Sequence, residues 1–206
     1  MKVYTIAITG RFGSGKTMIS NILKEKGIFL LMVDEIAHDL YEKGTACWNQ
    51  IIEYFGKSIL NATGEIDRKT LGKIVFSDKK KLAKLNSVMF PALKERVIEL
   101  HSSQIHKSEI IVIDCALLFE MQLDVLANEI WIPYVPESIL VQRLKNKLIY
   151  SEESIYQRLS LQMTFETIVN KCQVVIDNKG SAIELGKNIE CLWYSKILPK
   201  LNRSSE

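Results

Sequence analysis

Residues 10–17 read GRFGSGKT, which matches the pattern G-x-x-x-x-G-K-[ST]. Such a loop turns its backbone N–H groups inward around phosphate oxygens, and its glycines permit the dihedral angles and close approach that the turn requires. In this pattern Lys16 reaches the β- and γ-phosphates, and Thr17 supplies a hydroxyl to Mg²⁺. The stretch therefore predicts a nucleoside triphosphate site whose contacts come from Phe12, Gly13, Ser14, Gly15, Lys16 and Thr17.

The segments around this loop alternate between short apolar strands and helices. A strand at 3–9 precedes the loop, and a helix at 16–26 follows it and ends before Gly27. Four further strands are predicted at 28–33, 109–114, 130–132 and 173–176. This alternation predicts an α/β fold of the P-loop NTPase type, with a five-stranded parallel sheet and helices on both faces.

Two helical excursions interrupt the strands. Helical periodicity at 48–55, 68–76 and 79–89 predicts a mainly helical insertion between the second and third strands. Residues 137–162 predict a helical hairpin broken near 149–151, and a terminal helix follows the fifth strand. Open α/β sheets bind ligands at the carboxyl ends of their strands, where both excursions begin.

Two acids and a basic segment are candidate functional residues, and residue type alone leaves each open. Asp34 follows the second strand, where it could accept a proton from an acceptor hydroxyl or cap the next helix. Asp114 ends an apolar strand, where it could hold a metal or its water, or simply be solvated. On the predicted hairpin, Arg143 and Lys147 share one face and Arg158 and Gln162 another; they could neutralise transition-state charge or serve solubility.

Composition excludes several classes of protein. The net charge of +3 over 206 residues and the lack of a basic stripe argue against a nucleic-acid partner. No apolar run reaches the roughly 18 residues of a membrane span, and no signal peptide is visible, so we expect a cytoplasmic protein without a membrane partner. Widely spaced cysteines indicate reduced, mostly buried thiols. A GTPase is disfavoured because Asn178-Lys179 lacks the following acid of N-K-x-D. The oligomeric state is not encoded in these patterns, although a monomer is favoured.

Taken in order, several stretches resemble the dephospho-CoA kinase family. They are the loop at 9–17, DEIAH at 34–38, GEIDR at 64–68, DCALLFE at 114–120, Arg143-Leu144 with Arg158 and Gln162, and Asp177-Asn178. The loop indicates only a nucleotide, whereas the DEIAH, GEIDR and LLFE stretches in this order are much more specific to the family.

The resemblance implies transfer of the γ-phosphoryl group of ATP to the ribose 3′-hydroxyl of dephospho-CoA, with Mg²⁺ as cofactor. It implies that Asp34 is the general base and acts with Lys16 and Arg143. Arg143 would contact the ATP phosphates, Asn178 would lie near the adenine, and Asp114 is a candidate second metal contact. The acceptor site would comprise Asp34, His38, Arg68, Phe90, Leu118 and Glu120.

The resemblance also implies three parts: a nucleotide-binding core at 1–33, 105–140 and 166–206, a substrate lobe at 34–104, and a lid at 141–165. The chain departs from the family pattern at Arg11, Met32, Phe90, Ala116 and Lys147. Arg11 replaces a glycine and would either add charge at the mouth of the phosphate site or face solvent. The alternatives are another small-metabolite or nucleoside-monophosphate kinase, and a catalytically impaired nucleotide-binding regulator.

Overall fold

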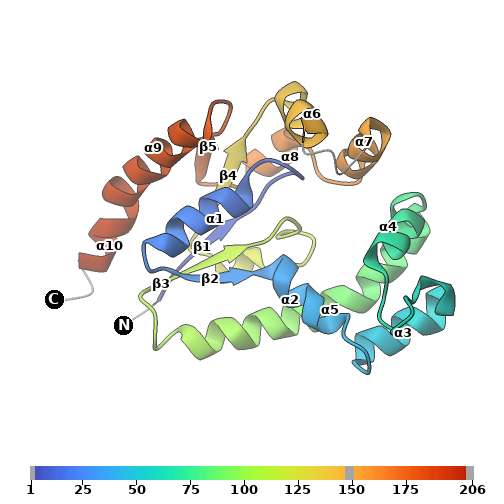
Figure 1. Cartoon of the computed structure of the whole chain (residues 1–206). Helices are drawn as coiled ribbons and strands as arrows, with labels where there is room; N and C mark the ends of the chain where they lie inside the picture. The colour runs from blue at the N-terminus through green and yellow to red at the C-terminus, as the bar shows by residue number, and fades with distance from the viewer. Residues whose placement is uncertain (1–2, 147–150, 203–206) are drawn as a thin grey trace. The chain divides into compact units, whose positions relative to one another are not determined.

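The predicted strands form one parallel sheet (Figure 1). The computed structural model describes residues 3–146 and 151–202. Within them the sheet has the order β2-β3-β1-β4-β5, and every neighbouring pair is parallel. The strands are β1 (Tyr4–Ile8), β2 (Phe29–Met32), β3 (Ile110–Asp114), β4 (Glu129–Tyr134) and β5 (Val174–Asp177). The predicted α/β fold with a five-stranded parallel sheet is confirmed.

Strand β1 is central, and the loop at 10–17 leaves from its carboxyl end. Ile8 lies in register with Asp114 of β3 on one side and with Trp131 of β4 on the other. After the loop the chain runs to β2, whereas β4 and β5 extend the sheet in the opposite direction. The loop therefore lies where the strand order reverses, which is the usual ligand position in open α/β sheets.

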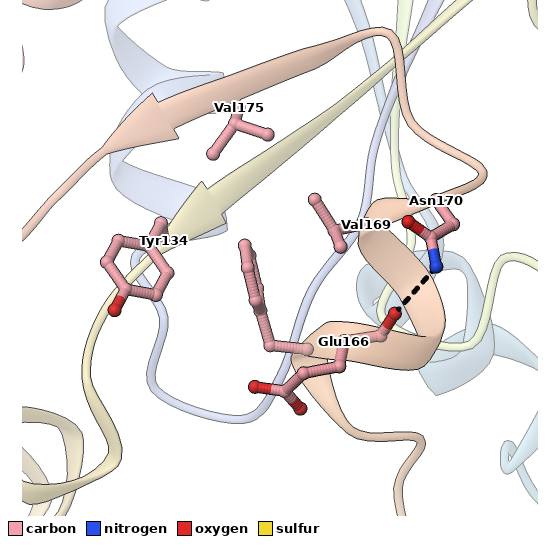
Figure 2. A pocket seen from close by; sticks show the side chains of 6 residues that line it. Tyr134, Glu166, Val169, Asn170 and Val175 are labelled. Carbon is pink, nitrogen blue, oxygen red and sulfur yellow. Dashed lines mark hydrogen bonds between the residues drawn. The ribbon is translucent and has the colours of Figure 1, made fainter.

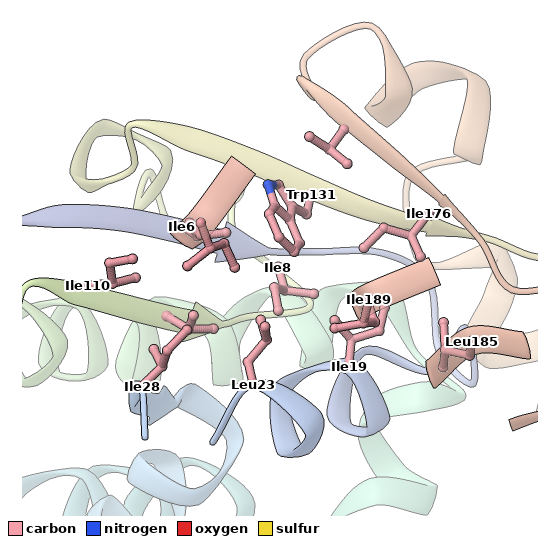
Figure 3. Packing of buried hydrophobic residues seen from close by; sticks show 13 residues of the cluster. Ile6, Ile8, Ile19, Leu23, Ile28, Ile110, Trp131, Ile176, Leu185 and Ile189 are labelled. Carbon is pink, nitrogen blue, oxygen red and sulfur yellow. The ribbon is translucent and has the colours of Figure 1, made fainter. Parts of the chain in front are cut away.

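Helices α1 (Lys16–Glu25) and α9 (Ala182–Leu192) pack on one face of this sheet. Ile19 and Leu23 of α1 are fully buried against Ile6, Ile8 and Trp131, which alternate along their strands toward this face (Figure 3). Burying a large aliphatic side chain contributes about 1.5–3 kcal/mol. The packing of α1 therefore fixes the direction in which its N-terminus and the preceding loop point.

Three helices follow β4: α6 (Glu137–Asn146), α7 (Glu152–Ser160) and α8 (Phe165–Val169). Helices α6 and α7 share a small apolar core that includes Leu140, Leu144, Ile155 and Leu159. The predicted helical hairpin is thus confirmed as two helices. Its break lies partly outside the described residues, and Ser151 caps the start of α7. The described residues after β5 form α9, a π-helical turn (Trp193–Ile197) and α10 (Leu198–Asn202).

The chain divides into two compact units, of which the second covers Val33–Glu99 and the first the remainder. The second unit contains α2 (Val33–Leu40), α3 (Ala46–Phe55), a 3₁₀ turn (Lys57–Ile59), α4 (Arg68–Phe76) and most of α5 (Lys79–Gln104). Its own core includes Ile51, Ile59, Leu71 and Val75, each at most 2% exposed. The functional roles of the predicted core, lobe and lid stay predictions.

Side-chain caps and apolar spacing explain where these helices differ from the sequence expectation. Helix α3 begins at Ala46 because Thr45 caps it by accepting a hydrogen bond from the Trp48 amide. Helix α5 continues through Pro91 to Gln104, beyond the segment of helical periodicity at 79–89. Buried residues at 85, 89, 93 and 97 maintain the helical spacing of its apolar face beyond the proline.

One alternative for Asp34 is excluded, and one expectation about the cysteines is wrong. Helix α2 begins at Val33, so Asp34 lies in its first turn and is not its N-cap. All four cysteines are free, as predicted, but only Cys47 and Cys115 are buried, and Cys191 is exposed. Among the helices in the described ranges, none combines the length and apolar character needed to cross a membrane.

A buried carboxylate at the start of β4 joins the π-helical turn to the start of β1. Glu129 accepts hydrogen bonds from the Tyr4 hydroxyl and from the Lys196 ammonium, each at 2.9 Å. Glu129 is only 6% exposed. Burial, and then the hydrogen bond to Glu129, raise the pKa of Tyr4 to about 12.

This raised pKa makes stability depend on alkaline pH. The folded chain holds the Tyr4 proton more tightly than the unfolded chain, so the contribution is present below pH 10 and is lost as pH rises toward about 12. We expect Tyr4→Phe to make the fall in unfolding free energy across this window shallower, as measured by urea denaturation at several pH values. Tyr41, whose pKa is also about 12, contributes a background slope to both proteins. An unchanged slope in Tyr4→Phe would contradict this assignment.

Candidate active site

The loop between β1 and α1 adopts a conformation that only glycine accommodates at three positions. Gly10, Gly13 and Gly15 have φ angles of 142°, 80° and 96°, which side chains with a Cβ rarely adopt. A Cβ on Gly13 would lie 2.8 Å from Leu144 Cγ, and a Cβ on Gly15 would overlap the Asn178 side-chain amide. The glycines therefore serve both the turn itself and the close packing of Leu144 of α6 and of Asn178, which follows β5, onto the loop.

Lys16 begins helix α1 and is buried over the loop. Its ammonium donates to the carbonyl oxygens of Gly10 at 3.0 Å and of Arg11 at 3.3 Å. These carbonyls hold the charge at the inner side of the loop, next to the positive end of the helix. Thr17 follows as the second residue of α1 and is exposed. This arrangement suits a polyphosphate chain with a cation beside it.

Asp114 lies at the carboxyl end of β3, beside the loop. It is 7% exposed, and its Oδ2 lies 2.9 Å from the Ser20 hydroxyl of α1. Ser20 is three residues after Thr17, so the two hydroxyls are neighbours on the helix surface. A buried carboxylate and hydroxyl oxygens form a donor set that fits Mg²⁺. Sequence analysis missed Ser20, and its position one turn after Lys16 was the only available signal.

Asn178, predicted near the adenine, fastens the loop to the end of β5. Its side-chain amide donates to the Ser14 carbonyl at 2.8 Å, and its backbone N–H donates to the Tyr134 carbonyl at 3.0 Å. Asn178 is 5% exposed. The residue therefore joins β4, β5 and the loop, and the proximity to adenine stays a prediction.

Arg143 of α6 binds the turn after β5. Its guanidinium donates to the carbonyls of Asn178 at 2.7 Å and Lys179 at 3.1 Å, and also to that of Gly180. The planar guanidinium thus organises three successive carbonyl groups. Its predicted contact with ATP phosphates remains a prediction, and Lys147 lies outside the described residues.

Two predicted acceptor residues follow β3 in the first unit. Leu118 is fully buried, so it packs beneath this segment. Burial raises the pKa of Glu120, while the nearby Lys171 ammonium lowers it by less. Lys171 Nζ also lies 4.8 Å from the centroid of the Phe119 ring. Lys171 therefore lies near both the Phe119 ring and the Glu120 carboxyl group.

The other predicted acceptor residues belong to the second unit. Asp34 and His38 are exposed and lie one turn apart on the same face of α2, and Tyr41 directly follows this helix. Burial raises the pKa of Tyr41, and the nearby Arg68 guanidinium at the start of α4 opposes that rise. The structure thus brings Arg68 to the end of the helix that carries Asp34. Phe90 lies within α5.

A separate pocket lies between β4, β5 and α8 (Figure 2). It is lined by Tyr134, Phe165, Glu166, Val169, Asn170 and Val175, and the rings of Tyr134 and Phe165 lie 4.8 Å apart. None of the loop residues 10–17 contributes to its lining. The pocket is therefore distinct from the phosphate-binding loop.

Comparison with known families decides which kinase this loop belongs to. The model of the dephospho-CoA kinase family matches residues 4–184. The chain belongs to the dephospho-CoA kinase family. The dephospho-CoA kinase of Carboxydothermus hydrogenoformans is 41% identical over 85% of this chain and 86% of its own. That of Arabidopsis thaliana is 34% identical over 96% of this chain and 84% of its own.

Solved structures show the same fold at lower sequence identity. A dephospho-CoA kinase from Campylobacter jejuni superimposes with a TM-score of 0.69 at 21% identity, covering 98% of both chains. TT1252 from Thermus thermophilus gives a TM-score of 0.77 at 23% identity, covering 95% of this chain and 99% of its own. The chain is thus an ATP-dependent kinase with a P-loop α/β fold.

The Asn178 contact yields the first prediction for the site. Replacing it, Asn178→Ala, removes the donor to the Ser14 carbonyl, so we expect the free energy of unfolding to fall by about 1–3 kcal/mol and ATP affinity to fall about tenfold. Isothermal titration calorimetry and urea denaturation measure the two effects. Asn188→Ala is the matched control, because the Asn188 amide holds the Asp177 carbonyl at 2.8 Å without contacting the loop. Equal ATP affinity in both variants would contradict the assigned role.

Proposed function

We propose that this chain transfers the γ-phosphoryl group of ATP to the ribose 3′-hydroxyl of dephospho-CoA, giving coenzyme A and ADP. Two observations support the proposal. The loop at 10–17 has the glycine-dependent conformation of a phosphate-binding loop, and the family model matches residues 4–184. Membership of the family indicates dephospho-CoA as the phosphoryl acceptor, and the loop is suited to bind ATP as the phosphoryl donor. Action in the cytoplasm and a monomeric state stay predictions.

Chain connectivity supports Asp34 as the residue that meets the acceptor hydroxyl. Met32 ends β2 in register with Asp114 of β3. Asp34 comes two residues after Met32, and two residues of extended chain span at most about 7 Å. Its backbone therefore stays within about 7 Å of the carboxyl end of β2. An exposed carboxylate at this position is suited to accept a proton or orient a hydroxyl.

The chain's own residues would act mainly by positioning and charge neutralisation. The loop amides and Lys16 bind the phosphates, and Asp34 orients the 3′-hydroxyl and takes its proton. Mg²⁺, held by Thr17 and Asp114, would neutralise phosphate charge when bound. Arg143 would neutralise further phosphate charge if its guanidinium exchanged the carbonyl partners for phosphate oxygens. The planar guanidinium can donate two parallel hydrogen bonds to such a group.

The second unit would supply the acceptor side. Asp34 and His38 share a face of α2, and Arg68 lies near Tyr41 at the end of that helix. Dephospho-CoA carries a pyrophosphate, so a guanidinium near the base suits this anionic acceptor. Leu118 and Glu120 would support the same substrate from the segment after β3.

The base assignment predicts a selective loss of turnover. We expect Asp34→Asn to lower kcat by about 10²–10⁴-fold, because a positioned base typically contributes that factor, while ATP affinity stays within about twofold. Steady-state kinetics and calorimetry with ATP measure the two quantities. Asp39→Asn is the control, since Asp39 is an exposed acid on a different face of α2. Unchanged kcat in Asp34→Asn would remove the residue from this role.

The acceptor itself is tested by ADP release measured across candidate substrates. We expect ADP formation to be stimulated by dephospho-CoA and not by nucleoside monophosphates. Stimulation by a nucleoside monophosphate alone would favour another small-metabolite kinase on this fold. ATP binding without acceptor-dependent ADP release would instead indicate a nucleotide-binding regulator.

A further inference from the structure

We propose that Arg11 is a positioning residue that ties the phosphate-binding loop to helices α6 and α7, and that this tie strengthens nucleotide binding. The inference rests on the proposed binding of ATP at the loop. It concerns a side chain at a position where the family pattern has glycine. Arg11 does not face solvent, which was one of the two arrangements expected from sequence, because its guanidinium points to the two helices.

A single side chain reaches both helices. Arg11 Nη1 donates to Glu137 Oε2 at 2.6 Å, and Arg11 Nη2 donates to the Leu159 carbonyl at 3.5 Å. Glu137 is the first residue of α6, and Leu159 lies in the last turn of α7. The Arg11 side chain is only 15% exposed. It also helps to lower the pKa of Glu166, after larger contributions from hydrogen bonds at the start of α8.

Neighbouring contacts join the same helices to the next loop residues. The Phe12 amide donates to Gln162 Oε1 at 2.8 Å, two residues after α7 ends. The Arg158 guanidinium lies 5.6 Å from the centroid of the Phe12 ring. Leu144 of α6 occupies the space where Gly13 lacks a Cβ. Three successive loop residues therefore contact α6, α7 or the segment after them.

The Arg11–Glu137 pair is suited to position this assembly more than to attract phosphate. A guanidinium hydrogen-bonded to a carboxylate is largely neutralised as a pair, and its geometry is fixed. Arg11 is also absent from the non-glycine residues with positive φ, so the backbone there accepts a side chain without strain. Groups that are already ordered bind a ligand more tightly, because less freedom is lost on binding.

The test is binding of a non-hydrolysable ATP analogue with Mg²⁺, measured by calorimetry. We expect Arg11→Ala and Glu137→Ala each to weaken binding about three- to tenfold, and the double variant to bind no more weakly than the weaker single variant. Arg11→Lys keeps the positive charge but loses the planar guanidinium that contacts both helices. We therefore expect its affinity to lie between those of the wild type and Arg11→Ala. Non-additive effects of Arg11→Ala and Glu137→Ala on the binding free energy are specific to a role that both side chains perform together.

Glu152→Ala is the matched control. Glu152 pairs with Lys145 at 2.7 Å, which joins α7 to α6 without contacting the loop. We expect this variant to bind the analogue within twofold of the wild type. The conservative variant Glu137→Gln, which keeps a side-chain oxygen as acceptor, should recover part of the affinity that Glu137→Ala loses.

Two results would overturn the inference. If Arg11 attracted phosphate directly, Arg11→Ala would weaken binding while Glu137→Ala would strengthen it or leave it unchanged. Unchanged affinity in Arg11→Ala, with the wild type binding normally, would also exclude the tie and leave the proposed function intact. A wild-type chain that binds no ATP analogue would instead contradict the proposed function itself.

Discussion

The hydrogen bond from the Asn178 side chain to the Ser14 carbonyl is the constraint on which the nucleotide site depends. It joins the loop after central β1 to the end of edge strand β5, across 164 positions of sequence. The bond is possible because Gly15 has no Cβ, which would otherwise occupy the place of the Asn178 amide. Because both residues are buried, leaving either group without a partner would cost about 1–3 kcal/mol.

Arg143 connects helix α6 to the same part of the structure. Its guanidinium binds the carbonyls that follow β5, beginning with that of Asn178 itself. Helix α6 is thus coupled to the loop through the β5 turn, through Leu144 on Gly13 and through Arg11. The nucleotide site is therefore held by one network of backbone carbonyls and side-chain donors within the first unit.

The order of strands and helices was predictable because it rests on local patterns. The apolar strands, the glycine-rich loop and most helix ends follow from residues a few positions apart. The Asn178, Ser20 and Arg11 contacts were not predictable, because each joins residues at least 94 positions apart. Helix α5 extends beyond the segment of helical periodicity at 79–89, because its apolar spacing continues past Pro91.

The departures from the family pattern leave the main chemical groups in place. The Thr9 hydroxyl donates to the backbone carbonyl of Ala116 at 3.5 Å, a contact that a proline at 116 would also permit. Met32 keeps its place in β2, in register with Asp114. Asp34, Lys16 and Thr17 are retained, so the groups that the proposed reaction uses do not lie at the substituted positions.

The most direct test of the proposed reaction is the position of the transferred phosphate. Wild-type protein is incubated with ATP, Mg²⁺ and dephospho-CoA, and the products are resolved by mass spectrometry and ³¹P NMR. A single new phosphomonoester on the ribose 3′-hydroxyl, formed in equal amount with ADP, is expected. Unmodified dephospho-CoA after complete incubation, or phosphate at another position, would contradict the proposed reaction.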